Sequence, residues 1–295
     1  MSAAQVAAAL DGAGGRRRPA LLVRLGRIGW LTTAAAIVAG LLMLVALFAP
    51  LLAPHDPEAI DPLFVFAEPS SSHRLGTDDT GRDLLSRLIH GARPSLAGPA
   101  IVVVLSSTLG LLLALAAGWL GGAVDAVISL ALDVLFAFPG LIIAVVAATV
   151  FGAGFVAPVV ALAVAYTPVI ARVLRAAVLR ERSLPYVAAL RVQGASGWRI
   201  CLRHIVPNVA PLLLVQSAVG FGYAMLDLAS ISFLGLGTQP PAPDWGVMAA
   251  NGQPSILDGH PQQSLYAALV VVVAVVSFNL VGERLARHFD LEDVR

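Results

Sequence analysis

The chain has 295 residues, of which 58% are hydrophobic and only 13% are charged, and its formal net charge is +1. Soluble domains carry about 25% charged residues, so this composition excludes an ordinary soluble protein and indicates an integral membrane protein. The single cysteine, Cys201, has no partner for an internal disulfide, and we expect it to be a buried thiol.

Six segments are long and apolar enough to cross a bilayer, which takes about 17–25 residues. They lie at about 29–53, 96–118, 124–147, 155–172, 209–235 and 264–282. Each is predicted to be a helix, because backbone inside lipid must satisfy its own hydrogen bonds. A β-barrel would instead show short alternating segments. We therefore expect an all-α, polytopic membrane protein with six transmembrane helices, flanked by tails at 1–28 and 284–295.

The first span follows an arginine-rich stretch, as the apolar part of a signal peptide does. Its apolar run is longer than such a segment, and five more spans follow. We interpret it as an uncleaved first transmembrane helix.

The arginines predict the orientation of the spans, because the chain contains no lysine. With six spans, both termini lie on one side, and 15 arginines fall on that side against four on the other. The four are Arg74, Arg82, Arg87 and Arg93, and seven acidic residues between Asp56 and Asp83 accompany them. The positive-inside rule therefore predicts cytoplasmic termini, an extracytoplasmic segment at 54–91 and a cytoplasmic loop at 173–208.

Two spans contain a feature that is costly or disruptive in lipid. Pro139, after Phe138, removes a backbone hydrogen bond and should kink the third span. Asp133 in the third span and Asp227 in the fifth should face the bundle interior, a cavity or a partner subunit. These four residues are candidates for the translocation path or for polar contacts in the bundle. The spans show no matching basic residue and no chain of acids or histidines, which disfavours a proton relay.

The loop between the fourth and fifth spans is a basic island in an apolar chain, with seven arginines, counting Arg172 at its edge, and one acid. Contact with anionic lipid headgroups is one interpretation. Apolar and small side chains, however, recur at helical spacing at Tyr186, Ala189, Leu190 and Val192. Gly194 and Gly197 should end this helix, and a second amphipathic turn should end at Pro207. Two short helices with small residues at the bend would form a compact protrusion that docks a partner.

This segment resembles the EAA motif of bacterial ABC importer permeases. Ala188-Ala189-Leu190 occupy the Glu-Ala-Ala positions, Gly194 the glycine, and Val206-Pro207 the Leu-Pro. Ala188 stands where the family has Glu, and His204 stands where it has Ile. In that family the segment is the coupling helix, which seats in a groove of the ATPase. The resemblance implies that the coupling residues are Tyr186, Val187, Ala188, Ala189, Arg191, Gly194, Ala195, Arg199 and Pro207.

Four further stretches resemble the dipeptide and oligopeptide branch of the same family. They are "PLLAPHDPEAID", "HRLGTDDTGRDLLSRLIHGARPSL", "LDVLFAFPGLI" and "ASISFLGLGTQPPAPDWGVM". The resemblance implies a type I importer permease domain at 92–283. One local departure is Leu228, which holds a position where the family often has an acid.

The resemblance also implies partners and a location. A permease of this kind lies in the inner membrane and pairs with a homologous permease. It sits on two ATPase domains, which bind the ATP and Mg²⁺, and takes its peptide or similar small solute from an extracytoplasmic binding protein. We expect no cofactor in this chain and no nucleic-acid partner. A proton-coupled secondary transporter is the main alternative, and a channel-like or scaffolding protein is a weaker one.

We expect no catalytic site in this chain. The phosphate-binding loop of ATPases requires a lysine, and the chain has none. Neither the H-E-x-x-H motif of metalloproteases nor the G-x-S-x-G motif of serine hydrolases occurs. The energy for transport must therefore come from another subunit.

Overall fold

The computed structural model describes residues 30–289, and within that range it is helical with no strand beyond one isolated bridge, Thr77 to Asp83. Five helices are long and apolar enough to span a membrane, and a bent pair makes a sixth. The predicted all-α, polytopic fold class is therefore confirmed. The tail predicted at 1–28 and residues 290–295 lie outside the described range.

The chain begins with α3 (Trp30–Leu47) and α4 (Ala49–Leu52) and then forms an irregular outer segment, residues 53–83. The remaining helices in order are α5 (Leu84–Leu120), α6 (Gly122–Phe136), α7 (Gly140–Phe151), α8 (Val156–Arg182), α9 (Pro185–Val192), α10 (Gly197–Ile200), α11 (Val206–Phe233), α12 (Trp245–Asn251), α13 (Gln253–Leu257) and α14 (Gln262–His288). A π-helical turn at Cys201–Ile205 joins α10 to α11.

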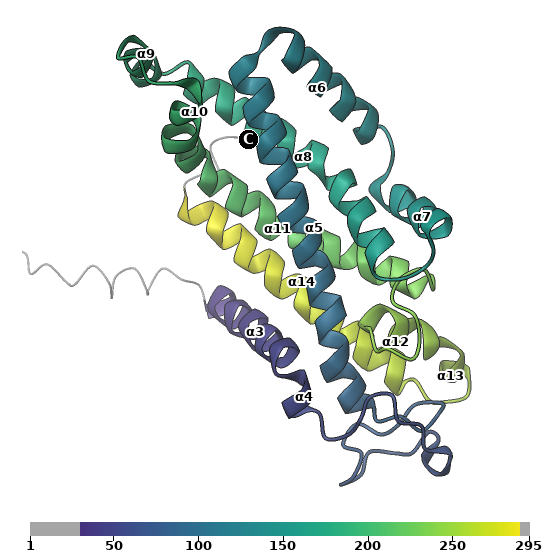
Figure 1. Ribbon diagram of the computed structural model, residues 1–295. Helices are drawn as coiled ribbons and strands as arrows, with labels where there is room; N and C mark the ends of the chain where they lie inside the picture. Colours follow the sequence, from purple (N-terminus) through teal and green to yellow (C-terminus); the bar gives the residue numbers. More distant parts are fainter. Residues whose placement is uncertain (1–29, 290–295) are drawn as a thin grey trace, which may run out of the picture.

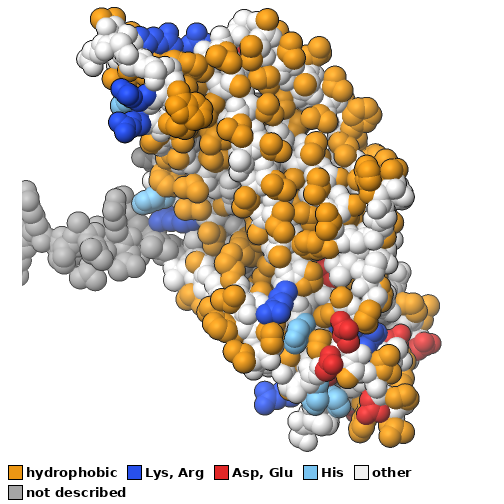
Figure 2. Space-filling view, viewed as in Figure 1, with side chains coloured by type: hydrophobic (Ala, Val, Ile, Leu, Met, Phe, Trp, Pro, Cys, Tyr) orange, Lys and Arg blue, Asp and Glu red, His pale blue; other side chains and the backbone are white. Residues whose placement is uncertain are grey.

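Helix α5 runs the length of the bundle (Figure 1). The α9 and α10 helices lie at one end, which we call the arginine end. The outer segment, α12 and α13 lie at the other, which we call the acidic end. Figure 2 shows apolar side chains between them, arginines near α9 and α10, and acidic side chains gathered around the outer segment. A belt of exposed apolar side chains between two polar ends fits a membrane-spanning bundle.

Two helices extend beyond the spans that apolar length predicted. Helix α5 begins at Leu84, where the Asp83 side chain accepts a hydrogen bond from the Ser86 amide at 2.8 Å and caps the helix. Helix α8 continues to Arg182. Hydropathy marks only the lipid-length part of a helix, whereas caps and packing decide where the helix ends.

The third span is broken at the predicted proline. Helices α6 and α7 meet at an angle of 79° across Ala137, Phe138 and Pro139. Pro139 precedes the first residue of α7 and cannot donate the hydrogen bond that would continue α6. The predicted kink is therefore a sharp break between two shorter helices.

The prediction that Pro207 ends a helix at the membrane surface is wrong. The chain continues through the π-helical turn into α11, and Pro207 lies in the first turn of that helix. The Val206 amide bonds back to the Cys201 carbonyl, five residues earlier. This wider turn removes the steric conflict that a proline normally creates in a helix.

The outer segment is fixed to the bundle by a buried arginine on α5. Arg87 is 1% exposed, and its Nη1 donates to the carbonyl of Pro57 at 2.9 Å and to that of Pro241 at 3.4 Å. Its Nε lies 3.6 Å from the carboxylate of Asp78, which also accepts from Arg82 Nε at 2.7 Å. One side chain thus connects both loops of the acidic end to α5.

Glycines on α5 permit its close packing with α8. A Cβ at Gly110 would lie 2.8 Å from Ile170 Cγ2, and one at Gly118 would lie 2.6 Å from Val178 Cγ1. Contacts this short are forbidden, so only glycine allows the backbone of α5 to approach α8 here. At a third position, Gly98, a Cβ would meet Leu228 of α11 at 2.8 Å.

We predict that Gly110→Leu lowers the stability of the chain by about 1–3 kcal/mol, because the new side chain forces α5 away from α8. Gly40→Leu is the matched control, because a Cβ at Gly40 meets no atom within 4 Å. Thermal unfolding in detergent should show a lower midpoint for Gly110→Leu alone. Equal midpoints would refute the packing argument.

We predict that the arginine end faces the cytoplasm. Ser183 and Asp258 are exposed at opposite ends of the bundle, whereas the native Cys201 is buried. In a Cys201→Ala background, Asp258→Cys should react with a membrane-impermeant maleimide in intact cells. Ser183→Cys should react only after permeabilisation, and the reverse pattern would contradict the orientation.

Candidate functional site

The segment between α8 and α11 forms two short helices with a bend at Gly194. Pro185 occupies the first turn of α9, where its missing amide hydrogen costs nothing. Gly194 follows α9 with a φ of +80°, and the amide of Ala195 bonds back to the Leu190 carbonyl at 3.0 Å. A side chain at this φ would be strained, so glycine is what allows the chain to turn into α10. We call residues 185–200 the α9–α10 segment.

Val187 anchors this segment to the bundle. It is fully buried and belongs to an apolar cluster with Ile200, Ile205 and Val209, together with Leu174 and other residues of α8. The segment therefore packs on the ends of α8 and α11.

A polar network reinforces this anchor. The Tyr186 hydroxyl donates to Glu181 Oε2 at 2.7 Å, and the side-chain Nδ2 of Asn208 donates to the same oxygen at 2.8 Å. Burial and the bond to Glu181 raise the pKa of Tyr186 to about 12. The hydroxyl therefore keeps its proton at neutral pH, and the network joins α8, α9 and α11.

Trp119, near the end of α5, supports the segment from a third helix. The Arg191 guanidinium lies 4.5 Å from the centre of its indole ring, within the range of a cation–π contact. A Cβ at Gly197 would lie 2.6 Å from Trp119 Nε1, so α10 rests directly on this ring. Trp119 was not among the predicted coupling residues, and the only signal for it in the sequence is an aromatic residue just before the Gly121-Gly122 turn.

The nine predicted coupling residues divide into two sets. Val187 is buried, and Tyr186 and Ala195 are half-buried, so these three attach the segment to the bundle. The other six are exposed: Ala188, Ala189, Arg191, Gly194, Arg199 and Pro207. The exposed set includes the small residues Ala188, Ala189 and Gly194, which would allow the backbone of a partner to approach closely.

Two large apolar side chains lie on the outside of the segment, one of them contrary to the sequence analysis. Val192 is 89% exposed and Trp198 is 69% exposed. Val192 was expected on the apolar face with Tyr186. Burial of Val187 fixes the rotation of the short helix α9, and Val192 then points outward.

Two ion pairs join α6 to α8. Arg172 Nη2 lies 2.5 Å from Asp133 Oδ1, and the Arg172 guanidinium lies 4.4 Å from the centre of the Phe136 ring. Arg175 makes two hydrogen bonds to the carboxylate of Asp125, each 2.5 Å long. The expectation that no basic residue matches Asp133 is therefore wrong, because α8 extends past residue 172 alongside α6.

Asp133 and Asp227 lie in different surroundings. The Asp133 side chain is 64% exposed and points away from the interior of this chain, so burial inside its own bundle, one of the expected placements, does not occur. Asp227 is half-buried between α8 and α11, where the Tyr166 hydroxyl donates to its Oδ2 at 3.0 Å. Each acid thus has its own partner on α8.

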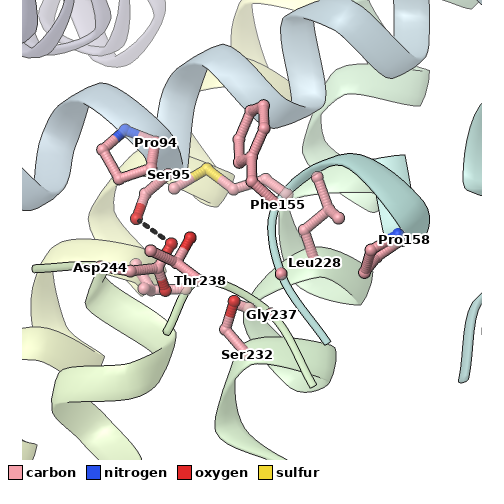
Figure 3. Close-up of a pocket in the computed structure, with 13 residues that line it drawn as sticks. Pro94, Ser95, Phe155, Pro158, Leu228, Ser232, Gly237, Thr238 and Asp244 are labelled. Carbon is pink, nitrogen blue, oxygen red and sulfur yellow. Dashed lines mark hydrogen bonds between the residues drawn. The ribbon is translucent and has the colours of Figure 1, made fainter. Parts of the chain in front are cut away.

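A small cavity of about 20 Å³ lies between α5, α8, α11 and the loop before α12 (Figure 3). Asp244 borders it and caps α12 by accepting from the amides of Gly246 at 2.9 Å and Val247 at 3.2 Å. Ser95 donates to Asp244 at 3.4 Å, and burial raises the pKa of Asp244. The cavity has room for about one water molecule, far too little for a peptide.

A much larger groove of about 880 Å³ opens between α8, α11 and α14 near the arginine end. Its wall combines apolar side chains such as Val173, Ala177 and Leu212 with polar and charged ones, which are Arg180, Glu181, Asn208, Gln216, Glu283 and Arg287. The candidate path residues Asp133, Phe138, Pro139 and Asp227 line neither this groove nor the small cavity.

Comparison with known proteins gives a family match over most of the bundle. Residues 106–291 match the family described as "Binding-protein-dependent transport system inner membrane component". The chain is 39% identical over 256 residues to the "Di/tripeptide transport system permease protein DppC" of Pseudomonas aeruginosa, covering 85% of this chain and 84% of the relative.

Two further curated relatives come from Escherichia coli. The "Probable D,D-dipeptide transport system permease protein DdpC" is 36% identical over 253 residues, covering 86% of this chain and 85% of the relative. The "Nickel transport system permease protein NikC" is 36% identical over 261 residues, covering 88% and 94%. The family is thus shared by relatives named for different solutes.

Among solved structures, the fold is similar to a chain of the MetNI methionine ABC transporter in inward-facing conformations. The TM-score is 0.55 at 20% sequence identity, with 70% of this chain and 97% of that chain covered. At this identity the likeness concerns the fold alone.

We predict that the Asp133–Arg172 pair stabilises the contact between α6 and α8. Asp133→Asn and Arg172→Gln should each lower the unfolding midpoint in detergent or liposomes, because each leaves an unpaired charge near the membrane. The double variant should lose less than the sum of the two, because no lone charge remains. Strictly additive losses would mean that the pair does not interact. Glu283→Gln, which breaks an exposed pair with Arg287 within α14, is the control and should change the midpoint little.

Proposed function

Because the chain belongs to the family of binding-protein-dependent transport system inner membrane components and is a permease subunit of an ABC importer, we propose that it forms half of a translocation path for peptides or similar small solutes. It is a multi-pass subunit of an inner-membrane transport system. We further propose that the α9–α10 segment couples this subunit to an ATPase.

The observation that carries the coupling proposal is the construction of the α9–α10 segment. Its outer surface is small and exposed at Ala188, Ala189 and Gly194, so the backbone of a partner can approach closely. Its inner surface is fixed to α8 and α11 through Val187 and the Tyr186 network, and to α5 through Trp119. A force applied to the segment is therefore passed to three membrane helices.

The energy source is proposed to be a separate subunit. The chain has no lysine and hence no phosphate-binding loop of the Walker type. ATP and Mg²⁺ would bind to two ATPase domains docked at the arginine end, and this chain would carry no cofactor of its own. Ala188 replaces the acidic residue of the coupling motif, so docking here would rest on shape more than on a salt bridge at that position.

The translocation path is proposed to form between two permeases. The small cavity of this chain has room for about 20 Å³, whereas the groove between α8, α11 and α14 has about 880 Å³ and is partly open to its surroundings. A homologous second permease facing this groove would close it into a path wide enough for a small peptide. A binding protein at the acidic end would deliver the solute.

The alternative of a proton-coupled transporter has little support in the described residues. Asp133 pairs with Arg172 between α6 and α8, while Asp227 bonds Tyr166 between α8 and α11. These are two separate local contacts between different pairs of helices. We therefore keep the ATP-driven mechanism.

The coupling proposal predicts that bulk on the outer surface of the segment weakens docking. Ala188→Leu and Gly194→Leu should reduce assembly with the ATPase about 10- to 100-fold, which corresponds to about 1–3 kcal/mol, or uncouple hydrolysis from transport. Gly194→Ala introduces similar backbone strain with little bulk and is the control for strain. The measurements are the amount of ATPase that co-elutes with the purified permease and the substrate-stimulated hydrolysis.

The lipid-binding interpretation of the same segment predicts a different pattern. Ala188→Leu and Gly194→Leu would then leave assembly unchanged, whereas Arg191→Gln and Arg199→Gln would have additive, salt-sensitive effects. Normal assembly and normal coupling in both leucine variants would refute docking at this surface.

A further inference from the structure

The acidic end holds a cluster of metal-ligating side chains that the transport function does not use. His55 follows α4, His73 lies in a turn of the outer segment, and Asp83 precedes α5. One ligand atom from each lies within 4.8 Å of the others. Three separate points of the segment 55–83 thus bring two imidazoles and a carboxylate together.

The separations between these ligand atoms fit a first-row transition metal. His73 Nδ1 lies 3.0 Å from Asp83 Oδ1, and His55 Nδ1 lies 3.8 Å from Asp83 Oδ2. A tetrahedral zinc ion with bonds of about 2.0–2.1 Å holds neighbouring ligand atoms about 3.3 Å apart. The two observed separations involve different oxygens of Asp83, and each lies within about 0.5 Å of this value, so small side-chain rotations would complete the site.

Hydrogen bonds already hold the ligands in place. Asp83 Oδ2 accepts from the Ser86 amide at 2.8 Å and from the Ser86 hydroxyl at 2.7 Å. The amide of His55 donates to the same hydroxyl at 3.0 Å. The carbonyl of His73 accepts from the amides of Ser70 and Gly76, which fixes the turn that carries this histidine. Partners of this kind orient metal ligands and raise affinity.

The cluster is closed on one side and open on the other. The side chain of Asp83 is 1% exposed and that of His73 is 14% exposed, whereas that of His55 is 40% exposed. A metal ion can therefore enter beside His55 and keep a water molecule as a further ligand. Two imidazoles with one carboxylate favour zinc, nickel or cobalt over magnesium or calcium, which prefer oxygen ligands.

We propose that His55, His73 and Asp83 bind a divalent transition-metal ion of the zinc class, which ties the outer segment to the first turn of α5. The ion has a structural role at the acidic end and takes no part in ATP hydrolysis. The competing explanation is that His73 and Asp83 form only the hydrogen bond seen between them.

The test uses the full chain, purified in detergent with its affinity tag removed and stripped of metal by a chelator. Zn²⁺ is titrated against a chromophoric competitor, and Co²⁺ is added separately to record its visible absorption. The variants are His55→Gln and His73→Gln. The control is His90→Gln, because His90 lies on α5 outside the cluster, with its Nδ1 3.1 Å from the Ser86 carbonyl oxygen.

We expect the unsubstituted chain and His90→Gln to bind one Zn²⁺ with the same affinity. His55→Gln and His73→Gln should bind about 10- to 100-fold more weakly, the range seen even when groups supporting a ligand are removed. Zn²⁺ should raise the unfolding midpoint of the unsubstituted chain, since a ligand bound only by the folded state stabilises it. Binding should weaken as pH falls, because neutral imidazoles bind the metal.

Three outcomes would overturn the proposal: no zinc binding by the unsubstituted chain, equal binding by His55→Gln, or a cobalt spectrum that is the same in His55→Gln. Because the His55 side chain is 40% exposed, we expect its substitution to leave the fold intact. Loss of binding in that variant therefore reports on the site itself and not on unfolding.

Discussion

The structure depends on the close approach of α5 to α8, which the absence of side chains at Gly110 and Gly118 makes possible. In lipid there is no hydrophobic force between helices, so tight backbone contact has to provide the attraction. Helix α5 reaches both ends of the bundle, and its packing therefore positions Trp119 beneath α10 at one end and Arg87 beneath the loops at the other.

The two ends are organised by different chemistry. At the acidic end, a buried arginine and carboxylates bind the loops to α5 through charge-assisted hydrogen bonds. At the arginine end, the α9–α10 segment is attached mainly through an apolar cluster and aromatic contacts, and its arginines remain at the surface. The first arrangement holds the loops of the acidic end firmly against α5. The second leaves a small, firmly anchored surface exposed for a partner.

Much of the fold was predictable from sequence because lipid imposes simple rules. Apolar length identified the spans, and Pro139 predicted the break between α6 and α7. The early start of α5 was missed because Asp83 lies among turn-forming residues and its capping role depends on Ser86. The pair of Asp133 with Arg172 was missed because it depends on how α6 and α8 lie against each other, which periodicity does not encode. Val192 was misplaced because burial of Val187 decides the rotation of a helix of only eight residues.

The length of α5 has a mechanical consequence. With 37 residues and a rise of about 1.5 Å per residue, the helix is about 55 Å long. If it pivots as a rigid rod about Trp119, a tilt of about 5° displaces Asp83 and the first turn of the helix by about 5 Å. Under that condition the helix would act as a lever arm, and a small movement of the α9–α10 segment would become a displacement of about 5 Å at the far end of the bundle.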